Sequence, residues 1–253
     1  ANLLTLSKNR KRIKKKKKNK NFSQKFEKRI SNSLSFKLTN DQLKVIKEIN
    51  LDLKSNERMF RILQGDVGSG KTIVSLLTIA NVIENNYQCA FMGPTEILSY
   101  QHFKLAEKIF ENTNFNIKFL TGKTELNNRR SILRDLANGK IDLIIGTHAL
   151  FQKNIKFKNL GYAVIDEQHK FGVKQRSDLA KKGGDNCDLL LMSATPIPRT
   201  MMMSLYGDMD ISKIREKPSS RKSIQTLSKP EKKIDQLWAY ISKQISSGNQ
   251  IFW

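Results

Sequence analysis

The chain has 253 residues, of which 38% are hydrophobic and 27% charged, as is typical of a globular protein with a hydrophobic core. No apolar run approaches the roughly 18 residues that a membrane-spanning helix requires, and the two cysteines, Cys89 and Cys187, exclude a disulfide framework. With 46 Lys and Arg against 23 Asp and Glu, the net charge is +23. This excess indicates either a polyanion partner, with nucleic acid the leading candidate, or a solvated charged surface, and the charge alone leaves both open. We expect a reducing, cytoplasmic setting and no membrane partner.

The positive charge is densest at the N-terminus. Residues 1–30 carry 13 basic side chains and one acid, Glu27, and they include five consecutive lysines, Lys14 to Lys18. Because dense like charges repel one another, we interpret residues 1–33 as a basic connector. Two roles stay open for it: a grip on duplex DNA through phosphate charge, or a solvated linker.

From residue 34 onward, helical periodicity alternates with short apolar runs. Thr39 is placed to cap a first helix over residues 40–54. Its predicted buried face comprises Leu43, Ile46, Ile49 or Asn50, and Leu53. Three further helices are predicted over residues 71–85, 96–111 and 125–138, the last stopped by Gly139.

Six short apolar runs lie between these helices and predict strands. They are Phe60–Gln64, Cys89–Met92, Ile117–Leu120, Leu143–Ile145, Tyr162–Ile165 and Leu189–Met192. Strands that alternate with helices indicate an α/β fold, in which helices flank a mostly parallel sheet. We therefore predict one domain of this kind over residues 34–215.

The pattern loosens around residues 217–221, which read as a linker. A helix over residues 231–247 and a strand beginning at 250–253 then predict the start of a second domain within residues 216–253. The first residue is Ala1 rather than Met, and the chain stops on an apolar run. We expect the sequence to be a piece of a longer polypeptide.

A complete phosphate-binding motif, G-x-x-x-x-G-K-[ST], follows the first predicted strand and opens a helix. Its residues are Gly65, Asp66, Val67, Gly68, Ser69, Gly70, Lys71 and Thr72. Glycines let consecutive backbone N–H groups turn inward around phosphate oxygens, and the helix N-terminus adds a positive dipole. The context predicts ATP, with Lys71 at the β- and γ-phosphates and the Thr72 hydroxyl on Mg²⁺, rather than a chance glycine loop.

A pair of acids, Asp166 and Glu167, follows the apolar run Tyr162–Ile165. Ligands of open α/β sheets bind at the carboxyl edge of the strands, where these carboxylates are expected to emerge. Asp166 is predicted to hold Mg²⁺, and Glu167 to orient and deprotonate an attacking water. Taken alone, the pair could equally be solvated; the upstream phosphate loop favours the catalytic interpretation.

The block Asp166–Val173 resembles motif II of the superfamily 2 helicases, within the group that holds RecG and the translocase Mfd. Gln168 and His169 are closer to the RecG-like pattern. Other blocks similar to RecG-like helicases are 38–42, 63–72, 94–98, 101–103, 120–122, 146–150, 193–200 and 205–208. Lys170 departs from the usual Arg, which keeps the charge but not bidentate geometry, and Ser193 replaces a frequent Thr.

The resemblance implies the first RecA-like motor domain of an ATP-dependent DNA helicase, followed by the start of a second lobe. Such an enzyme uses ATP and Mg²⁺ to remodel branched DNA, namely Holliday junctions, stalled forks and D- or R-loops, in recombination and repair. A 3′–5′ polarity, a monomer and a bacterial, nucleoid-associated location are implied as well. Because the second lobe supplies an arginine to the γ-phosphate, we expect this chain alone to be poorly active.

The resemblance also assigns roles to single residues. Gln42, with Thr39, resembles an adenine-reading motif, although a helix cap and a surface glutamine would explain both residues as well. Residues expected to touch the DNA backbone are Thr95, Thr121, Gly122, Thr147 and His148. Arg199 is expected to contact either DNA or the second lobe. Residues expected to couple nucleotide state to DNA contact are His169, Ser193 and Thr195.

Two other functions stay open at this point. One is an Mfd-like translocase that couples transcription to repair, against which the pair Gln168 and His169 argues. The other is a non-catalytic, basic nucleic-acid-binding module with a decayed phosphate loop. Intact Lys71, Thr72, Asp166 and Glu167 argue against that decay.

Overall fold

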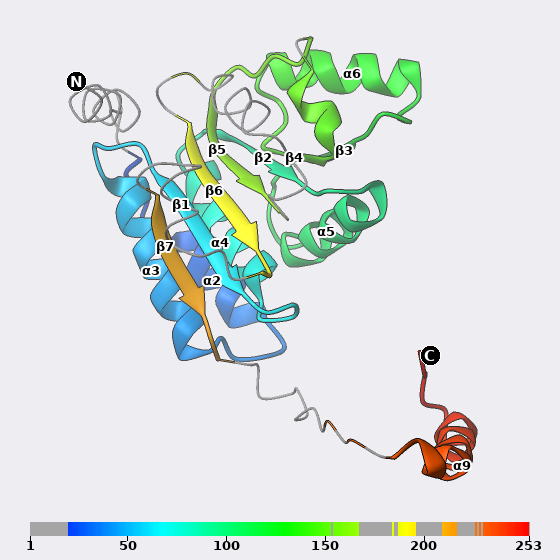
Figure 1. The fold of residues 1–253 in the computed structure, drawn as a ribbon. Helices are drawn as coiled ribbons and strands as arrows, with labels where there is room; N and C mark the ends of the chain where they lie inside the picture. Colours follow the sequence, from blue (N-terminus) through cyan, green and yellow to red (C-terminus); the bar gives the residue numbers. More distant parts are fainter. Residues whose placement is uncertain are drawn as a thin grey trace, which may run out of the picture. The chain divides into compact units, whose positions relative to one another are not determined.

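The structure, a computed structural model, describes residues 20–152, 154–166, 184, 187–195, 209–216, 226, 228 and 230–252. The chain divides into two compact units, Ala1–Pro218 and Ser219–Trp253. The first unit contains a sheet covered by helices (Figure 1). The second contains a 3₁₀ turn, η4 (Glu231–Lys233), and helix α9 (Ile234–Ser246). The predicted boundaries at residues 34 and 216 stay predictions, although the latter lies next to the division after Pro218.

The first unit is organised by one seven-stranded sheet. Its strands are β1 (Phe60–Gly65), β2 (Gln88–Met92), β3 (Ile117–Leu120), β4 (Leu143–Gly146), β5 (Leu160–Ile165), β6 (Asp188–Ser193) and β7 (Asp210–Ile214). Their order across the sheet is β3-β4-β2-β5-β6-β1-β7, and every neighbouring pair is parallel. The predicted α/β class with a parallel sheet is confirmed, and the six predicted strands match within two residues at each end.

Helices cover both faces of the sheet, which explains why the strands read as continuous apolar runs. One face packs against α2 (Lys25–Ser33), α3 (Asn40–Lys54), α4 (Lys71–Ile83) and α5 (Glu96–Ile109). The other face packs against α6 (Leu126–Ala137) and the 3₁₀ turn η1 (His148–Phe151). Along β2, Phe91 joins the first core and Met92 the second. Among the described residues, none of these helices combines the length and the apolar character needed to cross a membrane.

The predicted helix ends are confirmed where capping chemistry fixes them. The Thr39 hydroxyl accepts from the backbone N–H of Gln42, whose side chain in turn accepts from the Thr39 N–H. At the end of α6, Gly139 adopts a φ of 75°, as a helix-stopping glycine does. The predicted buried face of α3 was wrong at one position: Leu43 is 44% exposed, because the helix turns Gln42 toward the phosphate loop instead.

Two elements were missed and one was wrongly predicted. Strand β7 pairs with β1 at the edge of the sheet, and its charged residues Asp210 and Lys213 are exposed, so it lacks the continuous apolar run that identified the other strands. Helix α2 lies inside the segment predicted as a connector. The strand predicted at 250–253 is absent over the described residues 250–252, because the described part of the second unit offers no other strand for pairing.

The segment from residue 20 to α2 is attached to the sheet of the first unit by buried polar contacts. Lys20 is fully buried, and its ammonium lies 2.6 Å from Oδ2 of Asp188, which is also fully buried. The other oxygen of Asp188 accepts from the Met59 N–H at 2.7 Å. Ile30 of α2 is buried in the core that α4 forms. The end of the basic segment is therefore part of the folded unit.

Removing the cation from this pair is predicted to destabilise the protein. In Lys20→Ala, Asp188 stays buried without its ammonium partner, so the free energy of unfolding should fall by about 3–5 kcal/mol. Urea denaturation followed by circular dichroism measures this change. The exposed Lys37→Ala serves as control and should change the free energy by less than about 0.5 kcal/mol. Equal stability of the two variants would show that residue 20 is not held against the sheet.

Candidate active site

Three adjacent strands bring the predicted catalytic segments to one edge of the sheet. Strand β6 lies between β1 and β5, with Gln64 opposite Ser193 and Ile165 opposite Leu191. The residues that follow each strand therefore emerge side by side at the carboxyl edge, where α/β proteins bind ligands. This arrangement places the phosphate loop after β1, Ser193 and Thr195 at the end of β6, and Asp166 after β5.

The phosphate loop has the backbone conformation that its glycines permit. Gly68 and Gly70 adopt φ values of 78° and 89°, in the left-handed region that favours glycine. Gly70 is the N-cap of α4, so the first N–H groups of this helix point out of its N-terminus beside the loop. The Lys71 ammonium donates to the carbonyls of Gly65, at 2.6 Å, and Asp66, at 3.0 Å, and is thereby held within the loop.

The loop residues fit a polyphosphate. Ser69 is 2% exposed, and its hydroxyl has no hydrogen-bond partner among the residues that the structure describes. A buried hydroxyl of this kind is costly unless a ligand or water completes it. Combined with the helix N-terminus and the Lys71 ammonium, it provides donors for phosphate oxygens. Thr72, half-buried in the first turn of α4, adds an oxygen of the kind that Mg²⁺ prefers.

Gln42 is committed to the loop rather than exposed on a helix surface. It is 2% exposed, and its Nε2 donates to the Ser69 carbonyl at 2.8 Å while its Oε1 accepts from the Thr39 N–H at 2.9 Å. The predicted helix cap is therefore confirmed, and the alternative of a surface glutamine is wrong, because the side chain is buried and braces the phosphate loop. A contact with adenine stays a prediction.

Asp166 is held by a residue that the sequence analysis did not assign to the site. Its backbone N–H donates to the Met92 carbonyl at 2.8 Å, and its Oδ2 lies 2.9 Å from Nε2 of His102 on α5. An ionised carboxylate only accepts, so the imidazole is the donor. In the sequence, His102 lies in the block 101–103 that is similar to RecG-like helicases, but no spacing rule links a helix residue to an acid 64 positions away. Its contact with Asp166 was therefore not predicted.

Of the other residues predicted to act in catalysis or coupling, the structure describes only Ser193 and Thr195. Ser193 is buried, and its hydroxyl donates to the Thr195 carbonyl at 3.0 Å, so these two residues form one local turn at the end of β6. Glu167, His169 and Arg199 lie outside the described residues.

Apart from Arg199, the residues predicted to touch DNA lie on the other half of the same edge, after β2, β3 and β4. Thr95 caps α5, with its hydroxyl accepting from the Leu98 N–H at 3.3 Å. Thr121 and Thr147 are buried, and the Thr147 hydroxyl has no partner among the described residues. Gly122 and His148 are exposed. Only some of these residues are therefore accessible to a DNA strand in this structure.

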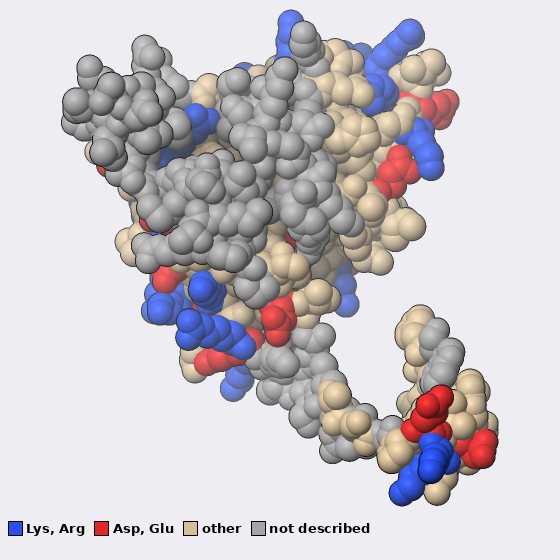
Figure 2. Space-filling view, in the orientation of Figure 1, with Lys and Arg blue, Asp and Glu red and all other residues tan. Residues whose placement is uncertain are grey.

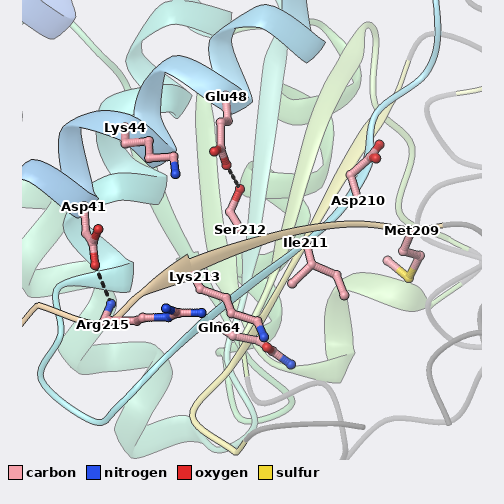
Figure 3. A pocket seen from close by; sticks show the side chains of 10 residues that line it. All are labelled: Asp41, Lys44, Glu48, Gln64, Met209, Asp210, Ile211, Ser212, Lys213 and Arg215. Atoms are coloured by element: carbon pink, nitrogen blue, oxygen red, sulfur yellow. Dashed lines mark hydrogen bonds between the residues drawn. The ribbon is translucent and has the colours of Figure 1, made fainter. Parts of the chain in front are cut away.

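A cavity of about 570 Å³ lies along the edge of the sheet between α3 and β7 (Figure 3). The N–H groups of Arg215 and Glu216 donate to the Asp41 carboxylate and hold the pKa of Asp41 below its usual value. These bonds fix the end of β7 to the start of α3. None of the predicted site residues lines this cavity, and Figure 2 shows acidic and basic side chains interspersed on the described surface of this face. The cavity lies next to the phosphate loop in the sequence, because Gln64, which lines it, directly precedes Gly65.

Comparison with known families matches most of the first unit to a helicase family. The family model described as DEAD/DEAH box helicase matches residues 39–204, which contain the phosphate loop, Asp166 and Ser193. The chain belongs to the DEAD/DEAH box helicase family. Within it, the chain is 46% identical over 220 residues to the ATP-dependent DNA helicase RecG of Thermotoga maritima, and 44% identical over 233 residues to that of Aquifex aeolicus. These alignments cover 87% and 92% of the chain.

A solved structure of RecG bound to a three-way DNA junction superposes with a TM-score of 0.85 at 39% identity, over 97% of this chain and 33% of that one. The DEAD-box helicase Mss116p, bound to single-stranded RNA, shares the fold alone, with a TM-score of 0.63 at 21% identity over 88% of this chain and 50% of that one. The predicted similarity to RecG-like helicases is thus confirmed. The chain spans 28% and 29% of the length of the two curated relatives.

A methyl group at Gly70 is predicted to disable the loop. A Cβ there would lie 2.3 Å from Nε2 of Gln42 and would also be strained by the positive φ. Gly70→Ala should therefore weaken the binding of a fluorescent ATP analogue by roughly tenfold or more, since such strain costs about 1–3 kcal/mol. Gly248→Ala is the matched control, with a φ of 81° but nothing within 4 Å. Unchanged affinity in Gly70→Ala would contradict the loop geometry.

Proposed function

We propose that the chain is the nucleotide-binding motor domain of an ATP-dependent DNA helicase that remodels branched DNA, as RecG-like enzymes do. The observation that carries this proposal is the shared edge of β1, β6 and β5, which unites the phosphate loop with Asp166. The 39% identity to a RecG structure bound to a three-way junction supports the substrate class. Holliday junctions, stalled forks and D- or R-loops in recombination and repair are the proposed substrates.

The chemistry at the nucleotide follows from the residues of this edge. The N–H groups of the loop and the Lys71 ammonium bind the β- and γ-phosphates of ATP. Thr72 and Asp166 hold Mg²⁺, which neutralises charge on these phosphates when it is bound. Glu167 orients the attacking water and accepts its proton. Gln42 braces the loop from α3 and contacts the adenine.

DNA lies along the other half of the edge in this proposal. Thr95, Thr121, Gly122, Thr147 and His148, together with Arg199, contact the sugar-phosphate backbone without reading bases. His169, Ser193 and Thr195 relay the state of the nucleotide to these contacts. The basic residues 1–33 add electrostatic affinity for duplex arms, with the steep salt dependence of such binding.

The proposal extends to the setting and kinetics of the enzyme. It is a monomeric, cytoplasmic, nucleoid-associated bacterial protein that translocates with 3′–5′ polarity. The chain by itself hydrolyses ATP slowly, because in such motors an arginine from the second lobe stabilises the γ-phosphate in the transition state. The retained Lys71, Thr72 and Asp166 favour this enzyme over a binding module with a decayed loop.

A chimera tests the proposed activity. The matching 220-residue segment of Thermotoga maritima RecG is replaced by this chain, and the unwinding of a three-way DNA junction is followed with ATP and Mg²⁺. We expect ATP-dependent unwinding, and we expect Lys71→Ala to slow it about 100-fold or more, because the phosphate charge loses its ammonium.

The same chimera separates the rival functions. Nucleotide binding with the affinity of the parent relative, but no unwinding of junctions and no stimulation of ATP hydrolysis by DNA, would contradict the helicase proposal. A chimera in which Lys71→Ala unwinds as fast as the parent would show that the loop is not catalytic.

A further inference from the structure

A side-chain contact joins His102 on α5 to Asp166, the candidate metal ligand. Nε2 lies 2.9 Å from Oδ2, and each side chain is 12% exposed. A hydrogen bond to a carboxylate is stronger than one between neutral groups, and little water competes with it at this exposure. The contact therefore sets the rotation of the Asp166 carboxylate.

His102 is itself held in place by packing. Its ring lies against that of Phe91, with centroids 4.7 Å apart and a 45° tilt, and Phe91 is fully buried on β2. One helical turn earlier, the Ser99 hydroxyl donates to the Gly146 carbonyl at 3.1 Å. Gly93 permits this close approach, since a Cβ there would lie 2.5 Å from the Ser99 Oγ. The imidazole is thus presented by a helix that is docked on the sheet.

Asp166 is attached to the same segment through its backbone. Its N–H donates to the carbonyl of Met92, which extends the pairing of β5 with β2 by one residue. Both the main chain and the carboxylate of Asp166 are therefore fixed by the β2–α5 segment. In metal sites, ligating carboxylates are commonly hydrogen-bonded by a second residue that orients them and tunes affinity.

We propose that His102 is a positioning residue for the metal: it orients the carboxylate with which Asp166 ligates Mg²⁺ beside the bound nucleotide. This inference rests on the proposed function, since it requires the site to hold a metal–nucleotide complex. A residue that only packed α5 against β2 would need the ring but not its N–H. The role of the N–H can therefore be tested apart from the role of the ring.

The experiment compares two substitutions in the full chain. His102→Leu keeps apolar bulk against Phe91 and removes the donor, whereas His102→Gln places an amide N–H near the former Nε2. Binding of Mn²⁺ in the presence of the nonhydrolysable analogue adenosine 5′-(β,γ-imido)triphosphate is measured by electron paramagnetic resonance. Binding of the same analogue without metal is measured in parallel by calorimetry. Lys108→Ala, exposed in the last turn of the same helix, is the matched control.

His102→Leu should weaken Mn²⁺ binding by about 10- to 100-fold and leave the metal-free affinity for nucleotide unchanged. His102→Gln should restore Mn²⁺ binding to within about threefold of the wild type, since a donor of similar reach returns. Wild-type Mn²⁺ affinity in His102→Leu would overturn the proposal. So would a loss that His102→Gln does not rescue, because that result would indicate a packing role.

Asp166→Asn probes the same contact from the other side. If His102 acts through Asp166, adding His102→Leu to Asp166→Asn should lower Mn²⁺ affinity no further, whereas additive losses would contradict the proposal. Failure of the proposed function has a different signature: the wild-type chain would bind neither the analogue nor Mn²⁺ with it.

Discussion

The parallel pairing of β6 with β1 on one side and β5 on the other is the constraint on which the site depends. It fixes Gln64 beside Ser193 and Ile165 beside Leu191, so that three segments far apart in the sequence emerge at one edge. Apolar strands buried on both faces supply the free energy for this pairing, and the polar residues that follow them are presented by it. A slip of one residue in either pairing would separate Asp166 from the phosphate loop.

The carboxyl edge of the sheet divides into two halves with different candidate roles. Strands β1, β6 and β5 precede the residues predicted to bind the nucleotide, whereas β2, β4 and β3 precede residues predicted to contact DNA. The halves join where β2 pairs with β5. Helix α5 begins beside Thr95 in one half and contacts Asp166 through His102 in the other. The two halves are therefore linked both by the β2–β5 pairing and by helix α5.

Much of the fold and the outline of the site could be predicted from the sequence. The central strands are recognisable in the sequence because burial on both faces demands apolar runs. The phosphate loop is recognisable because its backbone needs glycines at positions of positive φ. Edge strand β7 gave no such signal, because Lys213 and Asp210 face solvent. Helix α2 was hidden by its charge, although Ile30 is buried.

The contacts that brace the site could not be read from spacing. The bond from Gln42 to the Ser69 carbonyl and the bond from His102 to Asp166 join residues that only the tertiary fold brings together. Local patterns report which residues can cap a helix or form a loop, but not which distant side chain meets them. For the same reason, the sequence pattern predicted a contact of Gln42 with the nucleotide but not its hydrogen bond to the Ser69 carbonyl.

The most direct test of the account is a crystal structure of the chain with Mn²⁺ and a nonhydrolysable ATP analogue, in which anomalous scattering locates the ion. The account predicts the ion between the Thr72 hydroxyl and the Asp166 carboxylate, with the phosphates on the backbone N–H groups of residues 68–71. An ion remote from Asp166, or a nucleotide bound in the cavity between α3 and β7, would contradict it.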